Sequence, residues 1–148
     1  MKTAILLIFI FLIPINGNSM IIDDLQNPES RKWIHFTDTV MGGISSGKLA
    51  YQIDDNEKYY RLTGDVNTEN NGGFIQFATE IKKVDNNNFT GIRLRVRGNG
   101  ESYQLHLRTR MTKLPWQYYS QEFITTEDWN VVELPFSKFK KSNFYQPK

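Results

Sequence analysis

The chain has 148 residues, which at about 100–200 residues per domain amounts to one domain. It carries 18 Lys and Arg against 16 Asp and Glu, a formal charge of +2. This near balance argues against nucleic acid as a partner, because nucleic-acid-binding proteins carry a strong basic excess. Cysteine is absent, which excludes disulfides, zinc knuckles, iron–sulfur clusters and thiol catalysis. Seven Tyr and ten Phe favour sheet over a helix bundle, since aromatic side chains pack well on pleated strands.

The first 19 residues have the three parts of a secretory signal peptide. Lys2 precedes an uncharged apolar run over residues 4–13, Pro14 ends that run, and Gly17-Asn18-Ser19 supplies small residues for cleavage. A membrane-spanning anchor is the weaker interpretation, because ten residues of helix reach only about 15 Å, half a bilayer core. We expect residues 1–19 to be removed. Residues 20–148 should then be exported as one domain to a bacterial periplasm or the medium, with no stable membrane anchor left.

Short strand-like runs, separated by Gly, Asn and Asp, follow along the rest of the chain. The predicted strands are Leu49–Ile53, Lys58–Val66, Gly73–Ile81, Thr90–Arg97, Ser102–Arg110, Gln117–Ile124 and Asn130–Leu134. Short strands with turn signals between them are typical of an antiparallel β-sandwich or jelly roll. We interpret the polar linkers at 54–57, 67–71 and 85–88 as solvated turns, with calcium ligation as the alternative.

Two successive predicted strands, 90–97 and 102–110, alternate between apolar and polar residues. If they pair as a hairpin, their apolar faces must lie on the same side. The register then places Val96 opposite Tyr103 and Leu94 opposite Leu105. The apolar sets are Ile92, Leu94 and Val96 on the first strand and Tyr103, Leu105 and Leu107 on the second.

The polar face of this predicted hairpin is a basic stripe, and aromatic residues follow it in the chain. Such a face could bind anionic groups or stack on sugars. The candidate binding residues are Arg93, Arg95, Arg97, His106, Arg108, Trp116 and Tyr118. We favour the alternative of a solvated outer face whose Arg side chains pair with Asp65, Glu80 or Glu122, since exposed ion pairs are common.

Three segments carry a more specific signal than composition. They are Trp33 followed by Asp38-Thr39-Val40-Met41-Gly42-Gly43-Ile44-Ser45, then Glu69-Asn70-Asn71-Gly72-Gly73-Phe74, and then Arg97-Gly98-Asn99-Gly100 with Tyr103 after it. Trp129, Leu134-Pro135-Phe136 and Phe139 come later. In this order and spacing, from about Trp33 to Phe139, the chain resembles the complex I intermediate-associated protein 30 family. The motif residues are Asp38, Met41, Gly42, Gly43, Asn71, Gly72, Gly73, Gly98 and Gly100.

This resemblance implies an all-β fold, a galactose-binding-like jelly-roll sandwich with antiparallel strands, and a non-catalytic role. Mitochondrial members are assembly chaperones for respiratory complex I, and the wider fold includes carbohydrate-binding modules. The chain departs from the family in having Asn99 where members usually have Asp. It also ends soon after the Pro-Phe segment, so we expect a jelly roll that is incomplete at its C-terminal end. An exported protein, moreover, cannot meet the cytoplasmic arm of complex I.

The glycine pairs and the tryptophans have a mainly structural interpretation. Gly42-Gly43 and Gly72-Gly73 are expected to permit positive φ or a close approach of the backbone, with ligand-facing loops as the alternative. Trp33 and Trp129 are expected to be core or edge aromatics. Trp116, which follows Leu114-Pro115 in a loop, is expected to be exposed.

No motif in the sequence predicts catalysis. His35 and His106 are the only histidines, and neither lies in a metal-binding motif. Ser45, His35 and Asp38 are the residue types of a catalytic triad, but no nucleophile elbow surrounds the serine. Because a catalytic site needs a constellation of groups, we expect a non-enzymatic protein without cofactor or metal.

The sequence therefore predicts an exported binding module. Its expected partner is an unidentified protein, in a chaperone or assembly role that the resemblance alone implies. Carbohydrate binding through Trp116, Tyr118 and Tyr119 is the alternative.

Overall fold

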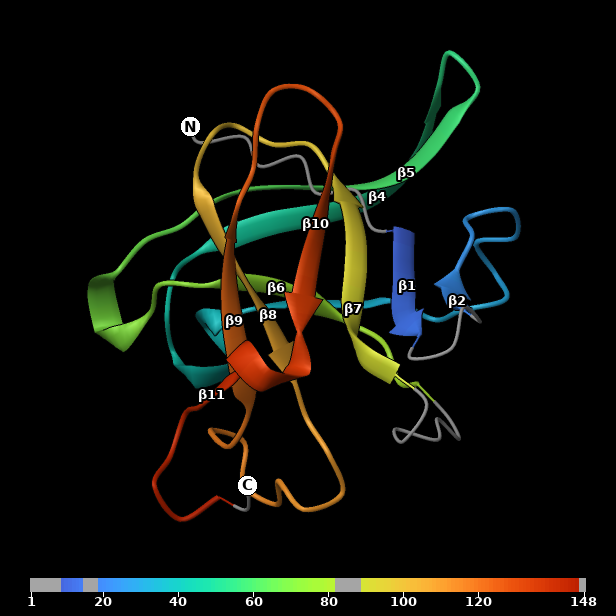
Figure 1. The fold of residues 1–148 in the computed structure, drawn as a ribbon. Coiled ribbons are helices and arrows are strands. Elements are labelled where there is room, and N and C mark those ends of the chain that lie inside the picture. The colour runs from blue at the N-terminus through green and yellow to red at the C-terminus, as the bar shows by residue number, and fades with distance from the viewer. Residues whose placement is uncertain (1–8, 15–18, 82–88, 147–148) are drawn as a thin grey trace.

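The computed structural model describes residues 9–14, 19–81 and 89–146, which form strands and short 3-10 turns (Figure 1). The strands are β1 (Phe9–Pro14), β2 (Met20–Asp23), β3 (Ile34–Thr37), β4 (Ser46–Asp54), β5 (Glu57–Asp65), β6 (Ile75–Ala78), β7 (Phe89–Val96), β8 (Ser102–Leu107), β9 (Tyr119–Ile124), β10 (Asn130–Pro135) and β11 (Lys140–Lys141). The turns are η1 (Asp38–Met41), η2 (Glu69–Asn71) and η4 (Phe136–Lys138). Within these ranges, no helix has the length and apolar character needed to cross a membrane. The predicted all-β class is confirmed.

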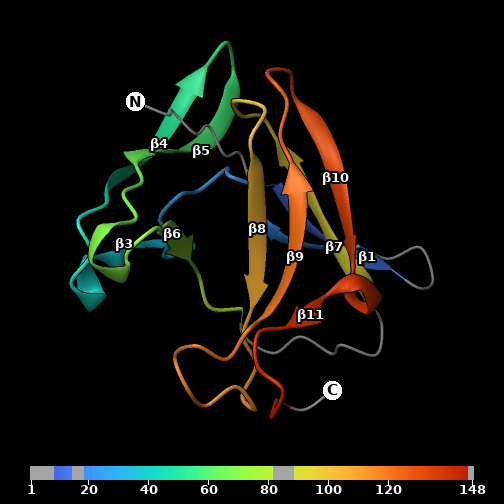
Figure 2. The ribbon, with the colours of Figure 1, turned by 90° about the vertical axis from the view of Figure 1, so that its left-hand side faces the viewer.

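Two antiparallel sheets enclose the core (Figure 2). One has the order β10-β7-β1-β2 and the other β11-β9-β8, while β3–β6 and β4–β5 form two further pairs. The buried core residues are Ile22, Leu62, Ile92, Leu94, Val96, Phe123 and Leu134. The core thus draws on β7 and β10 from one sheet and β9 from the other, which is the arrangement of a β-sandwich.

The seven predicted strands correspond to β4 through β10. Their alternation is also confirmed in β7, where Leu94 is 1% exposed and the Arg residues beside it are half-buried. Four strands of the described residues were not predicted: β1, which lies in the predicted signal peptide, and β2, β3 and β11, which have at most four residues each. A strand this short holds too few alternating positions to give a period.

The predicted hairpin between β7 and β8 is wrong. β7 pairs with β10, so that Leu94 lies opposite Val132, while β8 pairs with β9, so that Leu105 lies opposite Gln121. The connection over residues 97–101 therefore crosses from one sheet to the other. The error has a physical reason. Alternation shows only that each strand turns its apolar face to the core, and two strands can do so from opposite sheets as well as from the same sheet.

Two glycines in this connection have backbone positions that residues with a Cβ would not adopt without strain. Gly98 has no room for a Cβ, because its backbone packs against the Thr125 side chain and its N–H donates to the Thr126 carbonyl at 2.7 Å. Gly100 has a φ of 81°, in the left-handed region that favours glycine. Asn99 accepts a hydrogen bond from the Tyr103 hydroxyl at 2.9 Å, so this turn is well fixed with Asn in place of Asp.

Part of the predicted signal peptide pairs with the sheet in the full chain. The backbone of β1, which lies within residues 1–19, pairs with β7 from Phe9–Arg95 to Pro14–Phe89 and with β2. In the full chain, residues 9–14 therefore form part of the sheet. Cleavage after residue 19 stays a prediction, and it would leave the β7 edge opposite β10 without its present neighbour.

The last strand of the described residues is the two-residue edge strand β11. β11 pairs Lys140 with Ser120 and Lys141 with Tyr119 of β9, and both Lys side chains are exposed. Charged side chains on a short edge strand discourage further pairing.

The polar linker at 85–88 lies outside the described residues.

Candidate functional site

The first and second motif segments are joined by one buried carboxylate. Asp38 is fully buried, and its side chain accepts hydrogen bonds from the Ser45 backbone N–H at 2.9 Å and from the Ser45 hydroxyl. It also accepts from the N–H groups of Gly73 at 2.5 Å and Phe74 at 3.4 Å. Asp38 thus ties the loop that contains η1 to the loop that follows η2, and these two loops lie side by side in Figures 1 and 2.

Local sequence explains why Asp38 points inward. Thr37 caps η1 by accepting from the Thr39 N–H at 3.3 Å, and the Asp38 N–H donates to the Phe74 carbonyl at 3.1 Å. The Ser45 hydroxyl accepts from the Asn67 N–H at 3.0 Å, so the network also includes the segment between β5 and η2. Among the described residues, the four hydrogen bonds to the Asp38 carboxylate all come from these two loops.

The glycine pairs have the structural roles that the sequence predicts. Gly42 and Gly73 have φ values of 90° and 130°, where only glycine is free of strain. Gly43 and Gly72 lie so close to Asp38 that a Cβ at either position would overlap its carboxyl group. Asn71 is the last residue of η2. The motif is therefore a cradle for the buried carboxylate.

The loop that Asp38 holds presents apolar side chains to solvent. Val40 is 69% exposed, Met41 66% and Ile44 50%, and we call these three residues the apolar tip. Exposed apolar side chains gathered on a fixed loop are typical of interaction sites, because their exposure brings no stability to the fold. The sequence singled out Met41 within the motif but missed Val40 and Ile44. One sequence feature could have identified them as exposed: Val40 and Ile44 are branched apolar residues on either side of Met41-Gly42-Gly43, in a predicted turn.

The candidate residues of the basic stripe do not form one site. Arg93 pairs with Glu133 at 2.7 Å, and Arg95 pairs with Glu57 through two bonds of 2.6 and 2.9 Å. The favoured interpretation of an ion-paired outer face holds for these two Arg residues, but the partners are not the predicted Asp65, Glu80 or Glu122. The Arg95 hydrogen bonds outweigh desolvation and lower the pKa of Glu57.

Arg97 belongs to an aromatic cluster instead. Its guanidinium lies 4.6 Å from the centre of the Trp129 ring and 5.9 Å from that of Tyr59, and Arg95 stacks on Trp129 at 5.0 Å. The Tyr59 and Trp129 rings meet edge to face at 5.8 Å. Trp129 is thus a half-buried edge aromatic, as predicted, and it is covered by cations. Nothing in the sequence indicated that Tyr59 would join it.

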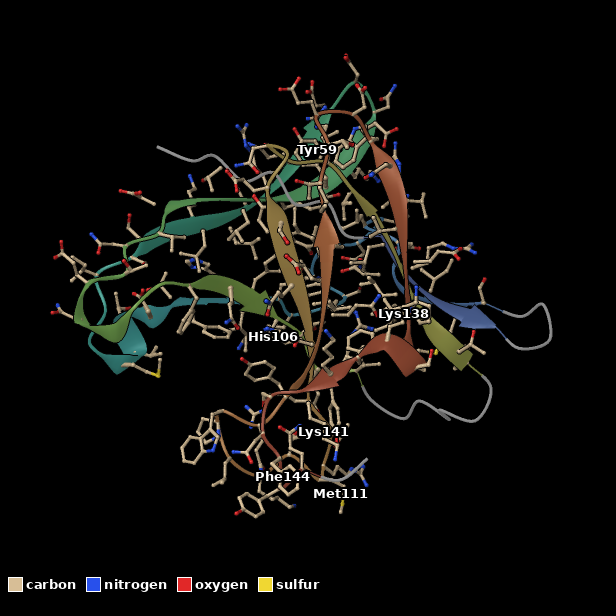
Figure 3. All side chains as sticks on the ribbon, turned by 60° about the vertical axis from the view of Figure 1, so that its left-hand side comes forward. Tyr59, His106, Met111, Lys138, Lys141 and Phe144 are labelled. Atoms are coloured by element: carbon tan, nitrogen blue, oxygen red, sulfur yellow. The ribbon has the colours of Figure 1, made fainter. Side chains whose placement is uncertain are left out.

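The remaining candidates belong to the other sheet or to its connection: His106 lies on β8, away from Tyr59 (Figure 3), and Arg108, Trp116 and Tyr118 lie between β8 and β9. The His106 and Tyr118 rings stack at 4.0 Å, and burial lowers the pKa of His106. Arg108 donates to the Thr112 and Leu114 carbonyls, at 3.4 and 3.0 Å, so it supports the loop after β8. Among the seven candidates, Trp116 is the large apolar side chain that reaches solvent, at 58% exposed, as predicted.

One groove of about 520 Å³ opens beside Trp33. Trp33, Leu49 and Tyr51 form its apolar wall, and Arg31 and Glu29 are among its charged residues. The Trp33 indole N–H donates to Asp23 at 2.7 Å, and the Tyr51 hydroxyl donates to the Leu25 carbonyl at 2.8 Å. The aromatic wall is therefore held in place by hydrogen bonds within the protein.

Asp38 should make the stability of the protein depend on pH. Burial raises the pKa of Asp38, but the hydrogen bonds from Ser45, Gly73 and Phe74 outweigh it and hold the pKa below its ordinary value of 3.8. The stabilisation is therefore complete above that ordinary value and is lost as pH falls through the folded pKa. We expect the urea unfolding midpoint to decrease between about pH 5 and pH 2.

Replacement of Asp38 tests the origin of this pH dependence. Asp38→Asn should have a lower unfolding midpoint at neutral pH and lose less stability on acidification, because it has no carboxylate to protonate. The matched control is Asp65→Asn, which removes an exposed carboxylate at the end of β5 and should behave like the natural chain. An unchanged midpoint for Asp38→Asn at neutral pH would contradict the role of the carboxylate.

Arg95 should contribute more to stability than Arg93. Arg93→Ala removes an exposed ion pair and should cost under about 1 kcal/mol, whereas Arg95→Ala removes a bidentate pair and a ring contact and should cost about 1–2 kcal/mol. Urea unfolding of both variants measures the difference. A double-mutant cycle with Glu57→Gln should give a favourable coupling energy for the pair with Arg95. Equal costs for the two Arg variants would show that stacking on Trp129 adds nothing.

One comparison with known proteins finds a match, and that match covers the motif loops. A family model described as complex I intermediate-associated protein 30 matches residues 23–146, a range that includes Asp38, both glycine pairs and the Arg97–Gly100 turn. No curated protein and no solved structure matches the chain. Because the match covers most of the sequence, the chain belongs to the complex I intermediate-associated protein 30 family.

Proposed function

We propose that this protein is an exported, non-catalytic binding module in complex assembly and that its protein partner docks on the apolar tip. The family points to an assembly role connected with complex I. The single observation that carries the proposal is the exposure of Val40, Met41 and Ile44 on a loop that the buried Asp38 fixes. A preformed apolar loop loses little conformational entropy on binding, so it suits a protein partner.

The Ser45 environment supports the non-catalytic part of the proposal. Ser45 is 2% exposed, and its hydroxyl donates directly to Asp38. A serine nucleophile must instead reach the substrate and give its proton to a base. The serine and the aspartate of the possible triad are thus used to hold two loops together.

Export limits where the partner can be. A module in the periplasm or medium meets only proteins, or parts of proteins, on the outer side of the membrane. The proposed partner is therefore an assembly intermediate that exposes an apolar surface on that side.

Photo-crosslinking tests the docking site. A crosslinking amino acid at position 41, in the host cell, should give a discrete adduct with one protein, whereas the same amino acid at position 53 should not. Ile53 is a matched control because it is 62% exposed on the β4–β5 hairpin. Val40→Ser with Ile44→Ser should reduce the adduct at least about tenfold, since apolar anchors dominate binding energy. Equal adducts from positions 41 and 53 would contradict the proposal.

Carbohydrate binding is the second candidate function, and the groove beside Trp33 is the observation in its favour. Aromatic side chains with polar groups at the rim are the usual lining of small-molecule sites. A glycan array with the natural chain and with Tyr51→Ala separates the two functions. Specific sugar binding that Tyr51→Ala abolishes, with no adduct at position 41, would replace protein docking by sugar recognition.

The export part of the proposal has its own test. Mass spectrometry of the protein from periplasm and medium should find a mature chain that begins near Met20. An intact Met1 on protein confined to the cytoplasm would contradict export and would leave the docking proposal to be judged by the crosslinking result.

A further inference from the structure

A second exposed apolar surface lies at the end of the molecule formed by the loop after β8 and the segment after β11. Its apolar side chains are all more than two-fifths exposed, and Phe144 reaches 91%. We call them, together with the exposed cations Arg110, Lys113, Lys140 and Lys141, the basic apolar end. The apolar members are Met111, Leu114, Trp116, Phe144 and Tyr145.

The two segments of this end are joined by hydrogen bonds. The Ser142 hydroxyl donates to the Trp116 carbonyl at 2.6 Å, and the Ser142 N–H donates to the Tyr118 carbonyl at 2.9 Å. Gln146 is 3% exposed, and its amide donates to the Tyr118 carbonyl at 2.9 Å. Figure 3 places Met111, Lys141 and Phe144 together at this end.

The loop after β8 is fixed from within. Thr112 is 5% exposed, its hydroxyl donates to the Thr109 carbonyl at 2.7 Å, and it accepts from the Thr109 N–H at 2.9 Å. Arg108 holds the Leu114 carbonyl at 3.0 Å, and the Leu114 N–H donates to Gln117 at 3.1 Å. Backbone polar groups are thus bonded inside the loop while apolar side chains point to solvent, so the exposure is not that of a loose chain.

The charge of this end has one sign. No Asp or Glu occurs at residues 102–121 or 134–148, although the whole chain contains 16 acids. The chain as a whole carries a charge of only +2, so the cations of this end are balanced by acids elsewhere. This end of the molecule therefore complements an anionic partner in charge.

We infer that the basic apolar end binds reversibly to the surface of an anionic lipid bilayer. Trp and Tyr prefer the headgroup level of a membrane, and exposed apolar side chains beside them enter the acyl boundary. Lys and Arg near the surface are attracted to anionic headgroups. The surface consists of projecting side chains, which suit a planar bilayer better than a peptide that needs a groove. This contact with the membrane surface is made by the basic apolar end and does not involve the apolar tip.

Vesicle flotation with the full chain tests this inference. At low salt the natural chain should float with vesicles that contain about one-third phosphatidylglycerol at least tenfold more than with pure phosphatidylcholine vesicles. Quenching of tryptophan fluorescence by brominated lipid should report insertion and should decrease in Trp116→Phe. Flotation that is equal with both vesicles, or absent with both, would overturn the inference.

Three matched variants separate this end from the rest of the chain. Arg110→Glu with Lys113→Glu reverses two charges, and Trp116→Ser with Phe144→Ser removes apolar surface. Each pair should reduce flotation about tenfold. Lys48→Glu with Ile53→Ser makes one change of each kind at exposed positions of β4 and should float like the natural chain.

The design also covers other causes of binding. All variants retain residues 1–19, so flotation caused by that segment would be the same in each and would overturn the inference. Binding to single-stranded DNA instead of vesicles, lost in the same charge variant, would overturn it in favour of nucleic acid. None of these readouts involves position 41, so the inference and the proposed docking site succeed or fail separately.

Discussion

The structure around the family motifs depends on one buried carboxylate. Asp38 satisfies four hydrogen-bond donors from two loops that lie more than 25 residues apart in sequence. A charged group without water must be compensated in this way, since an unpaired buried charge is costly. The glycine pairs follow from the same constraint, because their missing Cβ atoms make room for the carboxyl group. The motif thus encodes two loops joined by hydrogen bonds, and the exposed apolar tip lies on one of them.

The proposed function rests on the apolar side chains that this scaffold leaves exposed. The sandwich buries Leu94, Val96 and Leu134 almost completely, yet apolar side chains remain in solvent on the Asp38 loop and at the basic apolar end. Each of these surfaces rests on backbone fixed by hydrogen bonds. The docking proposed for the apolar tip and the membrane contact inferred for the basic apolar end use separate surfaces, so one molecule can make both contacts at once.

The sequence predicted which side chains are buried far better than it predicted which strands pair. Alternation in β7 identified Ile92, Leu94 and Val96 as core residues, and composition identified the all-β class. The hairpin with β8 was wrong because alternation specifies a face and says nothing about the neighbouring strand. Similarly, Arg95 was expected to be paired on the surface, and it is, but Glu57 is brought to it by the separate β4–β5 hairpin. Neither Tyr59 nor Trp129 could be assigned to Arg97 from local pattern alone.

What the sequence by itself determined was local: strand segments, turn glycines, the exposure of Trp116 and the family motifs. These depend on a period of two, on backbone sterics and on residue type, all of which act over a few positions. Only the tertiary structure decided that β7 and β8 lie in opposite sheets, that Asp38 joins two distant loops, and that Val40, Met41 and Ile44 remain exposed. Those outcomes depend on which surfaces meet across the core, and contacts between distant segments leave no periodic trace in a single sequence.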